Sequence, residues 1–122
     1  MLKKILLTLL FSFTLSVFAG EYEDALKKSD KIFLYFYTDE CRYCQKFKPI
    51  FEEISNLYRE KCEILSIDGN TNYGQDLAQK FRVKFLPYVI LVDVKKDKGL
   101  VINPDCLLQY ACTDGIVKEF VE

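Results

Sequence analysis

Apolar and polar positions separate a buried strand from a long helix. Residues 32–37 are apolar without alternation, which is typical of a strand buried on both faces of a parallel sheet. Residues 41–60 carry apolar side chains at three- and four-residue steps, the stripe of an amphipathic helix. Pro49 lies within this stripe, and because the stripe continues beyond it we expect a kink rather than an end. The two segments predict a strand that leads directly into a kinked helix.

The remaining pattern continues the alternation of helices and strands. Further helices are predicted at residues 21–29, 77–81 and 105–120, and further strands at residues 62–67, 88–94 and 100–102. Thr113-Asp114-Gly115 marks a possible break in the last helix, and residues 68–74 are rich in turn formers. Alternating strands and helices imply an α/β fold with a parallel core, and the short turn between the last two strands implies an antiparallel edge. A length of 122 residues indicates one domain.

The N-terminal residues differ from the rest of the chain. Two lysines precede residues 5–19, which are uncharged, apolar and followed by a small residue. This layout predicts a secretory signal peptide cleaved after Ala19, because the apolar run is shorter than the roughly 20 residues of a membrane-spanning helix. We therefore expect residues 1–19 to be a signal peptide and residues 20–122 to form an exported domain, with an uncleaved anchor as the alternative.

Charge argues against a protein that binds nucleic acid. The formal net charge is −1, and acids interrupt the densest basic patch, which consists of Lys95, Lys96 and Lys98. Binding to a phosphate backbone needs a clustered basic face. We therefore expect no nucleic acid partner.

Five cysteines follow the predicted signal peptide, and two of them, Cys41 and Cys44, form a C-x-x-C motif where the long helix begins. At the first turn of that helix, unpaired backbone donors and the helix dipole favour the Cys41 thiolate. Arg42 adds a neighbouring cation. Cys44 lies on the same helix face, where it can attack a mixed disulfide at Cys41. The motif therefore predicts an attacking and a resolving cysteine.

Two other interpretations of the pair are weaker. A purely structural disulfide between Cys41 and Cys44 would close a very small loop and restrain the unfolded chain little. Zinc needs further ligands, but the chain has no histidine, and Cys106 and Cys112 are spaced too widely for a zinc knuckle. We therefore expect redox chemistry at the pair, with no metal and no cofactor.

The order of these features resembles the thioredoxin superfamily, and in particular the small exported thioredoxin-like proteins of bacteria. A buried strand precedes C-x-x-C, a long helix carries it, Pro49 follows Cys44 by five residues, and Pro87 precedes another strand. The resemblance implies a thioredoxin fold with a central mixed four-stranded sheet flanked by helices, in the periplasm or secreted. It also implies that Pro87 is a cis-proline, beside which the backbone of Leu86 pairs with a substrate peptide.

Further contacts and several departures follow from the same resemblance. Tyr43 and Tyr88 are expected near the cysteines, where they add an apolar surface for substrate. Arg42-Tyr43 replaces the family's Gly-Pro, Tyr35 stands where thioredoxin has a buried aspartate, and Ile64 replaces the lysine partner of that aspartate. Arg42 and Glu40 are therefore expected to tune the redox potential. Glu40 or an ordered water is the candidate proton acceptor for Cys44.

The other three cysteines leave alternatives open. Cys106 and Cys112 would lie about 9 Å apart along a continuous helix, beyond the roughly 6.8 Å that a disulfide spans between Cα atoms. A bridge between them therefore needs a broken helix, and it would serve as a staple or as a second redox pair. The alternative is two reduced thiols. Cys62 is expected to be a small core residue, with pairing to Cys106 or Cys112 as the alternative.

The resemblance implies a thiol–disulfide oxidoreductase acting on the disulfides or thiols of exported proteins, such as an apocytochrome or a misoxidised protein. The small size, without an inserted helical domain, resembles reductases or interchange enzymes more than oxidases. A membrane redox partner would reduce the pair again. The alternative function is a thioredoxin-fold binding module whose disulfide does not exchange.

Overall fold

The computed structural model describes residues 20–122, so the predicted signal peptide lies outside the described residues. The helices are α2 (Glu21–Lys28), α3 (Arg42–Tyr58), α4 (Asn72–Lys80), α5 (Pro104–Leu107) and α6 (Tyr110–Val121), and the strands are β1 (Lys31–Tyr37), β2 (Glu63–Asp68), β3 (Tyr88–Asp93) and β4 (Lys98–Val101). No helix between residues 20 and 122 has both the length and the apolar character needed to cross a membrane.

The four strands form one mixed sheet in the order β2-β1-β3-β4. β1 is parallel to β2 and antiparallel to β3, and β3 is antiparallel to β4. The predicted mixed sheet and antiparallel edge are confirmed. The predicted parallel core was too extensive, because only the β1–β2 pair is parallel.

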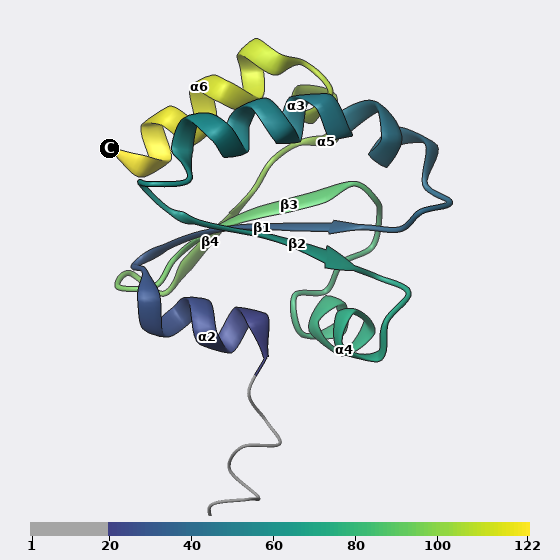
Figure 1. The fold of residues 1–122 in the computed structure, drawn as a ribbon, viewed down its shortest axis with the longest axis horizontal. Helices are drawn as coiled ribbons and strands as arrows, with labels where there is room; N and C mark the ends of the chain where they lie inside the picture. Colours follow the sequence, from purple (N-terminus) through teal and green to yellow (C-terminus); the bar gives the residue numbers. More distant parts are fainter. Residues whose placement is uncertain (1–19) are drawn as a thin grey trace, which may run out of the picture.

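Helices cover both faces of the sheet, as Figure 1 shows, with α3, α5 and α6 on one face and α2 and α4 on the other. Alternate residues of β1 supply the two cores. Phe33 and Tyr35 pack with the α3 side, whereas Ile32, Leu34 and Phe36 pack with the α2 and α4 side. Burial on both faces explains why β1 is apolar without alternation.

Helix α4 begins earlier than predicted, inside the stretch that resembled a turn. Thr71 caps it, because its hydroxyl oxygen accepts a hydrogen bond of 2.9 Å from the Gly74 N–H. A Cβ atom at Gly74 would overlap the Asp68 carbonyl oxygen. Glycine at this position therefore allows the first turn of α4 to lie against the end of β2.

The C-terminal helix is broken, but the break is not at Thr113-Asp114-Gly115 as predicted. α5 ends at Leu107, α6 begins at Tyr110, and α6 runs through those three residues. Thr113 is fully buried, and its hydroxyl lies 3.1 Å from the carbonyl oxygens of Cys106 and Leu107. Thr113 therefore joins the two helices across the break.

Candidate active site

Cys41 is the N-cap residue of α3, immediately before the first helical residue. Its backbone is extended, with φ −77° and ψ 110°, and its Sγ accepts a hydrogen bond of 3.1 Å from the Cys44 N–H. Cap geometry thus directs a backbone N–H that has no carbonyl partner within the helix, together with the positive end of the helix dipole, at this sulfur. Both interactions stabilise a sulfur that carries negative charge.

The two sulfurs of the pair differ in access. Cys41 and Cys44 form a disulfide with a Cα–Cα separation of 5.2 Å. Cys41 is partly exposed, whereas Cys44 is only 3% exposed. A disulfide approaching from solvent therefore reaches Cys41 first.

The two residues between the cysteines point outward. Arg42 is exposed, and Tyr43 is 54% exposed, with the Lys46 ammonium 5.3 Å from its ring centroid. An aromatic ring this exposed next to Cys41 is available to a bound partner.

Glu40 faces the loop that follows β2. Its carboxylate is exposed and accepts a hydrogen bond of 2.9 Å from the Asn70 side-chain amide. This bond, together with a backbone hydrogen bond, lowers the pKa of Glu40. A carboxylate with a lowered pKa is a poor proton acceptor, so Glu40 is poorly suited to the acceptor role that the sequence suggested.

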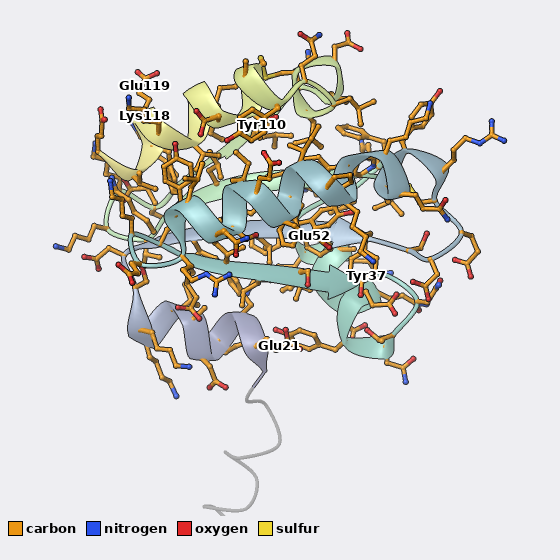
Figure 2. The ribbon with its side chains drawn as sticks, turned by 45° about the horizontal axis from the view of Figure 1, so that its top comes forward. Glu21, Tyr37, Glu52, Tyr110, Lys118 and Glu119 are labelled. Carbon is orange, nitrogen blue, oxygen red and sulfur yellow. A yellow bond between two sulfur atoms is a disulfide. The ribbon has the colours of Figure 1, made fainter. Side chains whose placement is uncertain are left out.

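Cys44 also lines a cleft of about 440 Å³ between one flank of α3 and the strands β1 and β2. Figure 2 labels two of its residues, Glu52 on α3 and Tyr37 at the end of β1. The full lining consists of Tyr35, Tyr37, Thr38, Asp39, Cys44, Gln45, Lys48, Phe51, Glu52 and Ser66. The cleft brings charged groups of α3 and of the loop before it to the buried cysteine.

Tyr35 occupies the cleft where the family resemblance placed a buried aspartate. Burial, followed by the neighbouring Tyr37, raises the pKa of Tyr35 to about 12. The Tyr35 hydroxyl therefore keeps its proton near neutral pH and cannot accept one from Cys44. Ile64 on β2 stands at the position of the lysine partner. It pairs with Phe33 on β1 and packs against the core.

Pro87 immediately precedes β3, at the end of the sheet where β1 finishes and the chain continues to Cys41. The Leu86–Pro87 peptide bond is cis, and Pro87 is buried. The next residue, Tyr88, pairs with Phe36, so Pro87 is level with the end of β1 from which the chain continues to Cys41. Among residues 20–122, the main-chain N–H and C=O of Leu86 have no hydrogen-bond partner. These groups are free to pair with another chain.

The predicted contact surface needs one correction. Tyr88 is only 6% exposed, because it pairs with Phe36 and points into the core beneath α2 and α4. Phe85, which the sequence analysis missed, is 42% exposed, and its ring centroid lies 5.3 Å from that of Tyr88. Phe85 therefore offers an exposed aromatic ring beside Leu86, which the buried Tyr88 does not.

The remaining cysteines lie away from the pair in the chain. Cys106 and Cys112 form a disulfide with a Cα–Cα separation of 5.3 Å, across the break between α5 and α6. Cys62 is buried and free, as predicted for a core residue, and burial is the main reason that its pKa is raised to about 11. Cys62 is therefore a protonated, inert thiol near neutral pH.

Lys48 and Glu52 were not predicted as site residues, although they follow Cys44 by one and two helical turns. That four-residue spacing was a usable signal, because it places side chains on the same flank of a helix.

Comparisons with known proteins agree with this geometry. The sequence model of the family described as Thioredoxin matches residues 13–104, well over half of the chain. The chain is 32% identical over 69 residues to endoplasmic reticulum resident protein 44 of Bos taurus, covering 53% of this chain but 17% of that protein. It is 27% identical over 85 residues to the thioredoxin of Borreliella burgdorferi, covering 70% of this chain and 68% of that protein.

The fold is similar to that of solved structures as well. Against the solution structure of a thioredoxin from Thermus thermophilus the TM-score is 0.61 at 22% identity, covering 81% of this chain and 80% of the other. At this identity the likeness concerns the fold alone.

Proposed function

Because this chain belongs to the thioredoxin family, we propose that it is a thiol–disulfide oxidoreductase whose working pair is Cys41 and Cys44. One observation carries the proposal: a partly exposed cysteine caps α3 and is bonded to a buried cysteine three residues on. The cap supports an attacking thiolate, and the short separation supports rapid resolution.

The reaction proceeds in two exchanges. The Cys41 thiolate attacks one sulfur of a substrate disulfide, and the other substrate sulfur leaves with the electron pair and takes a proton from solvent. Cys44, once deprotonated, attacks the Cys41 sulfur and releases the second substrate sulfur as a thiol. Two electrons pass to the substrate, and an external dithiol must return two electrons to the pair.

Substrate binding in this proposal uses the surface around the pair. The free main-chain groups of Leu86 pair with an extended substrate segment, as in strand addition, and Pro87 holds them at the end of the sheet. Tyr43 and Phe85 supply exposed aromatic contacts. Arg42 and Glu40 adjoin Cys41 with opposite charges and tune its potential.

The cellular setting is also part of the proposal. We infer from the apolar N-terminal segment that the domain is exported, to the periplasm or beyond, and that its substrates are disulfides of other exported proteins. Reduction or interchange is favoured over oxidation, with a membrane redox partner as the source of electrons.

A redox titration tests the activity. The purified chain is equilibrated in glutathione buffers, and free thiols are trapped by alkylation and located by mass spectrometry. A potential of the Cys41–Cys44 pair between about −120 and −270 mV is expected of an exchanging protein. A pair that stays oxidised well below about −300 mV indicates a fixed disulfide, and hence the binding module, instead.

A trapping variant tests the substrates. Cys44→Ala removes the resolving sulfur, so mixed disulfides to Cys41 should accumulate and be released by reductant. The variant is expressed with residues 1–19, which are expected to export it, and without them, which should keep it in the cytoplasm. The partners captured in the two compartments are then compared. Absence of covalent partners in both, when a Cys41→Ala/Cys44→Ala control behaves identically, would contradict the exchange of protein disulfides.

A further inference from the structure

Lys48 is the charged residue that helix geometry places closest to Cys44 within the cleft. Both residues line the cleft, and Lys48 follows Cys44 by one turn of α3. Residues four apart on a helix have Cβ atoms about 5–6 Å apart. Long helical side chains lean toward the N-terminus of their helix, so the Lys48 side chain leans toward Cys44.

The Lys48 ammonium is not neutralised by an ion pair. Within residues 20–122, the salt bridge with a nitrogen–oxygen distance within 4.0 Å joins Lys95 to Asp30. Both residues are distant in sequence from those that line the cleft. Lys46, two residues before Lys48, differs in position: its ammonium lies over the Tyr43 ring, and it does not line the cleft. The chain therefore contains two nearby lysines, of which Lys48 lines the same cleft as Cys44 and Lys46 does not.

The other titratable groups that line the cleft are two tyrosines and the carboxylates of Glu52 and Asp39. Tyr35 and Tyr37 keep their protons, because burial raises the pKa of both. Glu52 lies about 12 Å from Cys44 along the helix axis, against about 6 Å for Lys48, and the interaction of charges falls with distance and screening. Asp39 is exposed, belongs to the loop before the helix, and lies close enough to Tyr37 for its charge to contribute to that pKa shift.

We propose that Lys48 is a positioning residue for the second exchange, because its ammonium stabilises the Cys44 thiolate. The inference rests on the proposed exchange activity. Cys44 gives its proton to solvent, its sulfur bonds to the Cys41 sulfur, and the bond between Cys41 and the substrate breaks. The substrate sulfur leaves with the electron pair and takes a proton from solvent.

Stopped-flow reaction with 5,5′-dithiobis(2-nitrobenzoate) separates the two exchanges. The reduced chain releases one thionitrobenzoate when Cys41 attacks and a second when Cys44 resolves the mixed disulfide. The phase that disappears in Cys44→Ala is the resolution step. Lys48→Met is measured from mildly acidic to strongly alkaline pH beside Lys46→Met, which removes the same charge outside the cleft.

The expected result is a pair of pH profiles that differ near neutral pH and converge at alkaline pH. Loss of a cation near a thiol raises the pH at which the thiol ionises by about one unit. At any pH below that of half-ionisation, the fraction present as thiolate is then about tenfold lower. A more basic thiolate is about threefold more nucleophilic. Resolution in Lys48→Met should therefore be about threefold slower near neutral pH, and the two rates should converge at strongly alkaline pH, where Cys44 is a thiolate in both chains and lysine side chains in general lose their charge. Lys46→Met should follow the unaltered chain, and the first phase should match in both variants.

Two outcomes overturn the inference. Either the resolution profile of Lys48→Met superimposes on that of Lys46→Met, or its rate falls equally at every pH, as a purely structural role would produce. If the unaltered chain releases no more thionitrobenzoate than Cys44→Ala, Cys44 does not resolve the mixed disulfide and the proposed exchange activity fails instead.

Discussion

The hydrogen bond between Tyr58 and Asp114 predicts a measurable link between the helix that carries the cysteines and the C-terminal helix. Tyr58 is buried near the end of α3, and its hydroxyl donates to the Asp114 carboxylate on α6 across 2.6 Å. Hydrogen bonds to charged groups contribute about 1.5–3 kcal/mol. Because Phe keeps the ring and removes only the hydroxyl, Tyr58→Phe should lower the unfolding free energy by about 1.5–3 kcal/mol in urea denaturation.

The same bond predicts how this loss depends on pH. The hydrogen bond to Asp114, followed by burial, raises the pKa of Tyr58 from 10.0 to about 12. The raised folded-state pKa means that the contribution is complete below the unfolded value and is lost as pH rises through the folded value. The difference between the unaltered chain and Tyr58→Phe should therefore be constant up to about pH 10 and shrink toward pH 12.

Tyr110→Phe is the matched control, because Tyr110 is 37% exposed on α6 and its hydroxyl has no hydrogen-bond partner among residues 20–122. Surface substitutions of this kind usually change stability by less than about 0.5 kcal/mol. If Tyr58→Phe is as stable as Tyr110→Phe at neutral pH, the bond does not join the two helices as argued.

Three further predictions follow from buried or restrained positions. Replacing Cys106 and Cys112 by Ala should lower the unfolding free energy by about 2 kcal/mol, since the bridge restrains the unfolded chain, and leave the potential of the active-site pair unchanged; an altered potential would indicate a second redox pair. Gly74→Ala should cost about 1–3 kcal/mol by thermal denaturation, because its Cβ overlaps the Asp68 carbonyl; an unchanged melting temperature would contradict that overlap. Cys62, buried with its pKa raised to about 11, should resist iodoacetamide at neutral pH until the chain is unfolded; rapid labelling of the folded chain would refute its burial.

The sequence predicted the buried strand and the long helix because hydrophobic periodicity reports burial directly. It did not predict the direction of β3, since an apolar run is the same in a parallel and an antiparallel neighbour. The start of α4 was missed because Asn72 and Gly74 favour turns on average, whereas Thr71 supplies a cap that overrides that tendency. Local propensity thus failed where a contact between elements decided the conformation.

The candidate site shows the same division. Cys41, Cys44 and Pro87 were identifiable from their spacing in the chain. Tyr88 was misplaced because adjacency to Pro87 does not fix which face of the sheet a side chain joins; pairing with Phe36 does. The cleft around Cys44 depends on how one flank of α3 lies over β1 and β2, a relation between segments that no single stretch of sequence contains.

In the proposed function, substrates pair with the free main-chain groups of Leu86, and this mode of docking has a consequence for substrate selectivity. Peptide amides and carbonyls are the same in every polypeptide, so docking through them is indifferent to the residues that the client carries. Discrimination then falls to whatever touches the exposed rings of Tyr43 and Phe85. Docking through the main chain, combined with two exposed aromatic rings, would let a small domain act on many different substrates. Substitution of Tyr43 or Phe85 would then change the substrate preference without altering the cysteine pair.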